Sequence, residues 1–152
     1  MKERFVYLTE KLQQERIAVA ILAQISMEES IRATIEYVNQ RTAFGQPIGK
    51  FQNTRFKLAE AATKAAVSRA FLDQLIARHM AGEAIVTEVS MAKWWSTDVA
   101  QDIISECMQL FGGYGYMEEY EIARRFRDIP VMAIYAGTNE IMKTIIAKNI
   151  GL

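Results

Sequence analysis

Gln13-Gln-Glu-Arg-Ile-Ala-Val-Ala-Ile-Leu-Ala-Gln-Ile25 is the stretch that decides the fold. Residues 17–23 are apolar without interruption, and a helix that is apolar on every side belongs inside a bundle rather than on its surface. Around this stretch, four apolar residues recur at helical spacing on one stripe: Leu8, Leu12, Val19 and Leu22. We therefore expect a long helix whose central part is buried.

One acid, Glu15, lies on this stripe between Leu12 and Val19. A carboxylate on a buried stripe is costly unless it is paired or functional. Arg16 follows it in the sequence, but adjacent residues on a helix do not face each other. The pattern alone favours a structural role, in which Glu15 pairs with another helix or lies where the stripe meets solvent. The alternative is that Glu15 is a general base.

The composition is that of a globular protein, and 152 residues suffice for one domain, residues 1–152. Basic and acidic residues number 18 each, so the net charge of zero gives no support for a nucleic-acid partner. The run 17–23 is too short to span a bilayer. With His79 and Cys107 as the only histidine and cysteine, we expect no metal site and no internal disulfide. A reducing compartment is the default.

Proline and glycine gather in a few short stretches, and the segments between them have helical periodicity. They predict helices over residues 3–39, 51–80, 84–110, 119–128 and 139–149. Residues 41–50 and 111–116 are expected to be a loop and a turn, and no segment is typical of a strand. The sequence thus predicts an all-α, up-and-down bundle of three long helices plus one or two shorter C-terminal helices.

The apolar residues of the second and third helices predict which faces are buried. One stripe of the second helix is Phe51, Leu58, Ala62, Ala65, Leu72 and Ile76. One face of the third helix carries Ile85, Val89, Ala92, Val99 and Ile103. Gly112 is placed to end the third helix, and Thr138 to cap the start of the last one.

Three loops could bind a ligand, although each also has a purely structural interpretation. The glycines of residues 112–115 are most often a helix end and a turn. The Ala-Gly-Thr of residues 136–138 precedes a helix, where exposed N–H groups could hold an anion or polarise a carbonyl, or merely begin the helix. Arg41, with Phe44 and Gln52 nearby, could hold a phosphate-bearing ligand or only connect two helices.

Taken together, these loops carry a resemblance. Arg41–Gln52 (RTAFGQPIGKFQ), Gln109–Gly115 (QLFGGYG) and Tyr135–Glu140 (YAGTNE) resemble, in this order and spacing, motifs of the C-terminal helical domain of acyl-CoA dehydrogenases. The resemblance covers essentially the whole chain. It implies FAD-dependent oxidation of an acyl-CoA thioester to trans-2-enoyl-CoA, with electron-transfer flavoprotein as the electron acceptor. It also implies a homo-oligomer, either a dimer or a tetramer.

The resemblance assigns roles residue by residue. Residues of the first motif resemble family positions that contact the FAD of a neighbouring subunit. Residues of the second motif resemble positions along the adenosine half of that FAD. Residues of the third motif, which comes after the short apolar segment 131–135, resemble further FAD contacts. The positions concerned are Arg41, Phe44, Gln52, Gln109, Phe111, Gly112, Gly113, Thr138, Asn139 and Glu140.

One departure from the family pattern locates the base. Many members have the catalytic glutamate where this chain has Ala136, and alanine cannot take a proton. The isovaleryl-CoA and long-chain branch instead has the base on the first helix of this domain, in a Leu-x-x-Glu-Arg motif that Leu12–Arg16 matches. The resemblance thus reverses the preference above and makes Glu15 the expected base.

The remaining substrate contacts also follow from the resemblance. Arg16 resembles a family arginine near the substrate, and Gln13 occupies a substrate position at which many members have aspartate. Ala136, with Gly137 beside it, resembles the segment whose backbone N–H donates to the thioester carbonyl.

Family members also have an N-terminal helical domain and a middle β-domain, so the resemblance implies that this chain is a fragment of a longer protein. A catalytically inactive helical dimerisation module is the alternative for the isolated chain. The expected compartment is the cytoplasm for a bacterial source and the mitochondrial matrix for a eukaryotic one.

Overall fold

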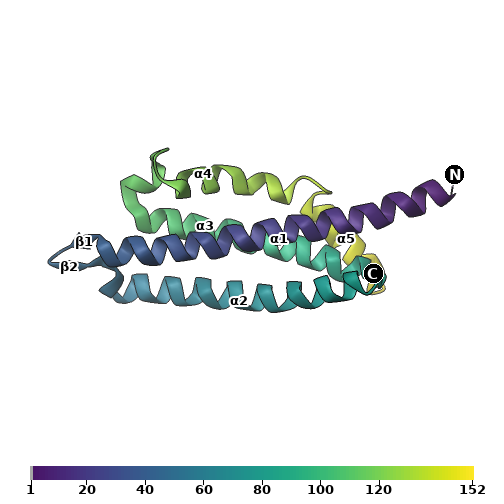
Figure 1. Ribbon diagram of the computed structural model, residues 1–152, viewed down its shortest axis with the longest axis horizontal. Helices are drawn as coiled ribbons and strands as arrows, with labels where there is room; N and C mark the ends of the chain where they lie inside the picture. The colour runs from purple at the N-terminus through teal and green to yellow at the C-terminus, as the bar shows by residue number, and fades with distance from the viewer. Residues whose placement is uncertain (1) are drawn as a thin grey trace.

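The computed structural model describes the backbone of residues 2–152 and the side chains of residues 12–152. Five α-helices account for most of the chain: α1 Lys2–Gln40, α2 Gln52–Met80, α3 Val86–Phe111, α4 Glu121–Asp128 and α5 Asn139–Asn149. The helices α1, α2 and α3 run alongside one another, and α3 packs against all the others (Figure 1). The all-α bundle predicted from the sequence is confirmed.

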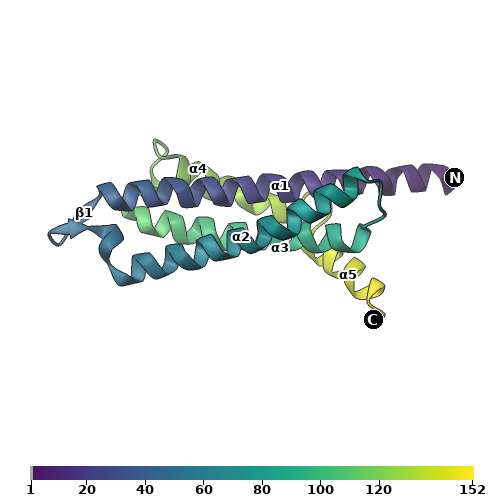
Figure 2. The same cartoon turned by 60° about the horizontal axis from the view of Figure 1, so that its bottom comes forward.

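The connections contain short regular elements that the sequence pattern did not predict. Strands β1 Thr42–Ala43 and β2 Gln46–Pro47 form an antiparallel hairpin within the expected loop. Three 3₁₀ helices lie in the connections: η1 Ile48–Lys50 between β2 and α2, η2 Gly112–Tyr116 after α3, and η3 Ile129–Ala133 after α4. The hairpin lies at one end of the bundle and α5 at the other (Figure 2).

The buried residues form two clusters along the bundle. The cluster nearer the hairpin joins α1, α2, α3, α4 and η3, and includes Met27, Ile104 and Phe111. The second cluster joins the first half of α1 to the end of α2 and the start of α3, and includes Ile17 and Leu72. All five residues predicted for the buried face of α3 are indeed buried.

The predicted burial of α1 is only partly right. Val19 is buried and Leu12 is half-buried, whereas Leu22 is 49% exposed and Glu15 is also exposed. The side chain of Leu8 lies outside the described residues. A helix between two neighbours buries one face only, and the buried face of α1 has a different centre, defined by Ala20, Ala23, Met27, Ile31, Thr34 and Val38. The uninterrupted apolar run therefore has an exposed side in this chain.

The predicted stripe of α2 is wrong at one position. Ala62 is exposed, and its neighbour Ala61 is buried instead. The buried face includes small polar residues that the apolar pattern overlooked, among them Thr54 and Ser68. In the described part of the chain, no helix combines the length and hydropathy that crossing a membrane requires.

Candidate active site

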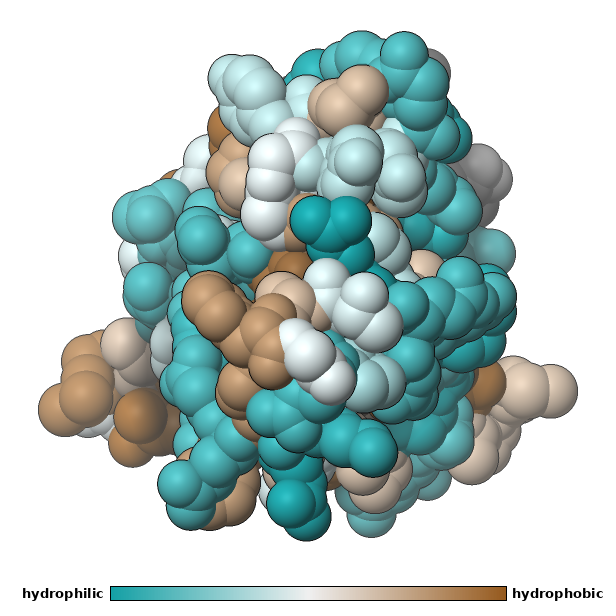
Figure 3. Space-filling view, turned by 90° about the vertical axis from the view of Figure 1, so that its left-hand side faces the viewer, coloured by the Kyte–Doolittle hydropathy of each residue, from teal (hydrophilic) through white to brown (hydrophobic). Residues whose placement is uncertain are grey.

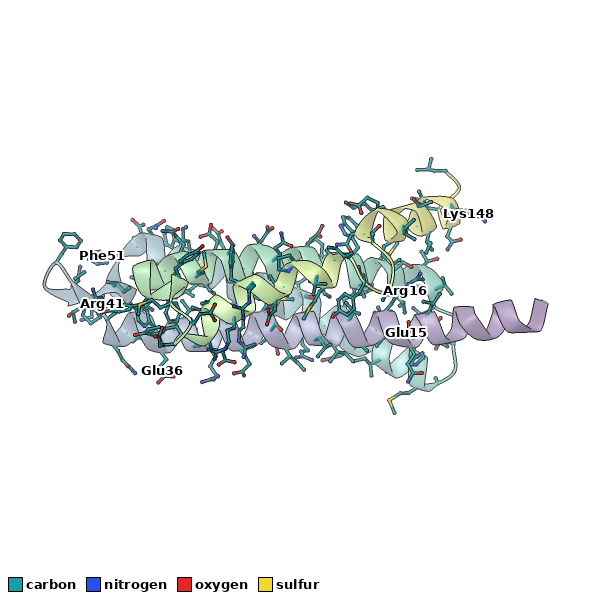
Figure 4. All side chains as sticks on the ribbon, turned by 90° about the horizontal axis from the view of Figure 1, so that it is seen from above. Glu15, Arg16, Glu36, Arg41, Phe51 and Lys148 are labelled. Atoms are coloured by element: carbon teal, nitrogen blue, oxygen red, sulfur yellow. The ribbon has the colours of Figure 1, made fainter. Side chains whose placement is uncertain are left out.

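The residues singled out from the sequence lie in two groups, at opposite ends of the bundle. Glu15 and Arg16 lie on α1 beside the loop that precedes α5, whereas Arg41 lies at the hairpin end (Figure 4). Between Arg16 and the end of α1 the helix rises by roughly 36 Å, at ~1.5 Å per residue. One chain therefore presents two separate surfaces.

Arg16 joins the first helix to a loop 120 positions later. Its Nε donates a hydrogen bond to the backbone oxygen of Ala136 at 3.2 Å, and the side chain is 9% exposed. Burial lowers the pKa of the Arg16 guanidinium, and the negative charge of Glu15 opposes that shift. Glu15 itself is exposed. The helix thus buries the cation against the loop and leaves the adjacent carboxylate accessible from solvent.

The loop at Ala136 and Gly137 has an unusual backbone. Ala136 has φ of 55° and Gly137 φ of 98°, so an alanine adopts a left-handed conformation that costs a non-glycine residue about 1 kcal/mol or more. A Cβ on Gly137 would lie 3.0 Å from Cε of Met142 and 3.6 Å from Nη2 of Arg16. Among the described residues, the N–H of Ala136 donates to no backbone carbonyl.

Helix α5 begins directly after this loop. Thr138 is at the predicted N-cap position with extended backbone angles, but its side chain makes no capping hydrogen bond. Its carbonyl accepts a hydrogen bond from Met142 N–H at 3.0 Å. The backbone N–H of Glu140 and the nearby Thr138 hydroxyl lower the pKa of the Glu140 carboxyl. The exposed Glu140 thus complements the positive end of the helix.

A lysine that the sequence analysis missed lies beneath the loop. Lys93 of α3 is 0% exposed, and its Nζ donates to the Gly137 oxygen at 2.9 Å and to Asn139 Oδ1 at 2.8 Å. Asn139 Nδ2 in turn donates to Thr97 Oγ1 at 2.9 Å and to Asp98 Oδ1 at 2.7 Å. The sequence contained one indication that Lys93 is buried. Its position in the helical repeat puts it on the same face of α3 as apolar residues one turn away.

Gln13 contacts the turn between α2 and α3. Its Nε2 lies 3.2 Å from Nδ1 of His79 and donates to the backbone oxygen of Glu83 at 3.3 Å. Its role as a substrate contact stays a prediction.

The second group surrounds an open hollow of about 580 Å³ at the hairpin end. Figure 3 views the molecule from this end. The hollow is lined by Tyr37, Arg41, Ile48 and residues 109–114 together with Met117. The Arg41 guanidinium lies over the Tyr114 ring at 5.5 Å, and Tyr37 stacks on Phe111 with ring centroids 4.1 Å apart. Gly112 and Gly113 have open space where a Cβ would be, so a ligand could approach their backbone closely.

The hairpin next to this hollow displays Phe44 at its tip. Phe44 is 96% exposed, has φ of 51°, and contacts Phe51 edge to face with ring centroids 6.3 Å apart. Gln52 is exposed at the start of α2. The described residues contain no group of three or more acidic, histidine or cysteine side chains that could hold a metal ion.

Comparisons with known proteins give one family. The family model described as "Acyl-CoA dehydrogenase, C-terminal domain" matches residues 5–151. The long-chain specific acyl-CoA dehydrogenase, mitochondrial, of Sus scrofa is 43% identical over 146 residues, which are 96% of this chain and 34% of that protein. The chain thus spans about a third of the length of this relative.

Solved structures agree with this result. The acyl-CoA dehydrogenase from Geobacillus kaustophilus is 63% identical and superposes with a TM-score of 0.95, covering 97% of this chain and 39% of that one. A structure described as PigA with FAD and proline is 25% identical, with a TM-score of 0.88, and covers 93% of this chain and 37% of that one.

Proposed function

The chain belongs to the acyl-CoA dehydrogenase family, and from this premise we propose that it supplies the catalytic base and part of the FAD surface for oxidation of an acyl-CoA thioester to trans-2-enoyl-CoA. The observation that carries the proposal is the contact between Arg16 and Ala136. It brings the two segments that resemble the family's substrate site together from opposite ends of the chain.

Glu15 is the proposed base, which removes the α-proton of the acyl group. Ala136 cannot accept a proton, and Glu15 precedes the residue that binds the Ala136 carbonyl. The carboxylate is exposed in this chain, so a bound acyl chain could cover it and remove water from it. The similarity to the long-chain specific relative supports placing the base on α1, as in the isovaleryl-CoA and long-chain branch.

The backbone N–H of Ala136 is proposed to donate to the thioester carbonyl, with Gly137 beside it. Removal of an α-proton leaves enolate charge on that oxygen, and a fixed donor aimed at the developing charge lowers the barrier. The absence of a carbonyl partner for this N–H among the described residues supports the role. Arg16 is proposed to lie near the same part of the substrate.

The residues at the hairpin end fit an FAD. Arg41 is suited to a phosphate, the aromatic rings to stacking, and the open backbone of Gly112 and Gly113 to close approach of the adenosine half. We assign Phe44, Gln52, Gln109 and Phe111 to the same surface. When bound, FAD supplies the acceptor for the hydride that leaves the β-carbon.

Thr138 and Glu140 are assigned to a second FAD surface, at the start of α5. The side chain of Asn139 is 4% exposed and its amide is bonded to Lys93, Thr97 and Asp98, so only the backbone of Asn139 is assigned to this surface. The two surfaces lie at opposite ends of the bundle (Figure 4). One chain would therefore contact two different FAD molecules, and a second copy would complete each site. This geometry supports a homo-oligomer, a dimer or a tetramer. Electron-transfer flavoprotein is the proposed acceptor, and the compartment is the cytoplasm or the mitochondrial matrix according to source.

The test is Glu15→Gln in the complete flavin-loaded enzyme, with Glu36→Gln as the matched control because Glu36 is also an exposed acid of α1. Loss of a general base should lower turnover by about 10²- to 10⁴-fold and leave the helical circular dichroism unchanged. The control should retain turnover. Near-normal turnover of Glu15→Gln would refute the assignment.

A second candidate function for the isolated chain is that of a helical oligomerisation module without activity. Large apolar side chains that are exposed on α2 and α3, namely Phe56, Val67 and Trp95, favour it. The visible spectrum of the purified chain after incubation with FAD and gel filtration separates the two candidates. Retained flavin supports the FAD surface, whereas a flavin-free oligomer supports the module.

A further inference from the structure

We propose that Lys93 is a positioning residue, which holds the backbone of the Ala136–Gly137 loop in the conformation that presents the Ala136 N–H. Its effect on catalysis rests on the proposed function, whereas its effect on the loop does not. No part of the resemblance to the family assigned a role to this lysine.

The contacts of Lys93 are those of a fixed anchor. A buried ammonium has three donors, and two of them are used, on the Gly137 oxygen and on Asn139 Oδ1, at 2.9 and 2.8 Å. Asn139 cannot rotate freely, because its own Nδ2 is bound by Thr97 and Asp98 of α3. The ammonium therefore ties the loop to α3 both directly and through the first residue of α5.

Two consecutive carbonyls of the loop are held by two cations from different helices. Arg16 of α1 binds the Ala136 oxygen, and Lys93 of α3 binds the Gly137 oxygen. Each peptide unit is planar, so fixing its carbonyl fixes the whole plane. The two fixed planes meet at Cα of Gly137 and therefore set φ and ψ of Gly137. The first of them also fixes the carbonyl side of Ala136, whose left-handed φ of 55° is the strained angle of the loop. A strained conformation of this kind persists only where its surroundings over-determine it.

The charge on Lys93 depends on pH within an accessible range. Burial lowers the pKa of Lys93 to about 8; Asp98 and Glu140 act to raise it, and Arg16 to lower it. These three are the charged groups that face it, from α3, α5 and α1. Hydrogen bonds from a charged donor are shorter and stronger than those from a neutral one, so the hold on the loop weakens as the ammonium loses its proton.

The first test is nuclear magnetic resonance of the ¹⁵N-labelled chain as a function of pH. The amide signals of Ala136, Gly137 and Thr138 should follow one titration with a midpoint of about 8. That titration should be absent in Lys93→Met and retained in Lys64→Met, which changes an exposed lysine of α2. Loop amides that do not titrate in the wild type, or that titrate alike in Lys93→Met, overturn the proposal. The wild-type titration tests the proposal even if the Lys93→Met variant does not fold.

The second test is steady-state kinetics of the complete enzyme. Displacing a catalytic donor slightly costs roughly 10- to 100-fold in rate, so Lys93→Met should lower kcat by that factor with KM nearly unchanged. Lys93→Arg should restore part of the loss and flatten the alkaline limb of the pH profile. An unchanged kcat in Lys93→Met contradicts the positioning role. Because the amide titration needs neither substrate nor Glu15, a failure of the proposed function remains distinguishable from a failure of this proposal.

Discussion

Burial of Lys93 carries a cost in stability that rising pH removes. The folded protein holds this lysine with a pKa lowered from 10.5 to about 8. Between these values the unfolded chain binds more protons than the folded one, so the free energy of unfolding increases with pH. The protonated lysine thus destabilises the fold fully below about pH 8, and the loss is recovered as pH approaches 10.5.

The size of the effect follows from the pKa difference. At ~1.4 kcal/mol for each pKa unit, complete deprotonation recovers roughly 3 kcal/mol. Between about pH 7 and about pH 9.5 the free energy of unfolding recovers roughly 2 kcal/mol of this amount. The recovery is incomplete because about pH 9.5 is still below the pKa of the lysine in the unfolded chain. Tyr37 and Cys107 oppose the trend, since the pKa of each is raised by burial. A comparison with a variant is therefore required.

Lys93→Met provides that comparison, because methionine has a similar length and no charge. Urea denaturation followed by circular dichroism should show that the wild type gains roughly 2 kcal/mol more than Lys93→Met between the two pH values. Lys64→Met, at an exposed site, should keep the wild-type pH dependence. Equal pH dependence in the wild type and Lys93→Met, within about 0.5 kcal/mol, would refute the reasoning.

Three further predictions concern individual residues. Gly137→Ala should lower the free energy of unfolding by about 1–3 kcal/mol, which is more than Gly82→Ala should. Both glycines have positive φ, but only at Gly137 does a side chain lie within 3.0 Å of the new Cβ. Equal losses of the two variants in urea denaturation would contradict this. Leu72→Ala, at a fully buried position, should cost about 2–5 kcal/mol, and Leu22→Ala less than about 1 kcal/mol. The reverse order in urea denaturation would invalidate the assigned core. Cys107 is 1% exposed and its pKa is raised by burial, so a thiol reagent should label it at least about 100-fold more slowly in native buffer than in urea; comparable rates would show an accessible thiol.

The helices were predictable because their signals are local. Gly112 ends α3 as expected, with φ of 61°, and Pro130 follows the end of α4 within the short helix η3. The buried face of α3 was also predictable, since its apolar residues recur with a clear helical period. The hairpin was not, because strands of two residues are too short to show a period of two.

The burial of α1 could not be read from its sequence for a physical reason. A stretch that is apolar on all sides gives no preferred face, and the face is chosen by the helices that pack against it. Lys93 was missed for a related reason. Its partners, the Gly137 oxygen and Asn139, lie more than 40 positions away, so only the three-dimensional arrangement shows why a cation is tolerated inside the bundle.

The adjacency of Glu15 and Arg16 accounts for how a base on α1 could replace one on the loop. Successive residues of a helix point in directions about 100° apart, so one can be buried while the next faces outward. Arg16 is buried against Ala136, which fixes where this turn of α1 lies relative to the loop. Glu15 precedes Arg16 on the same turn of α1, and its charge acts on the Arg16 guanidinium. The proposed assignment of the base to Glu15 therefore requires that the residue after the carboxylate continues to bind the loop carbonyl.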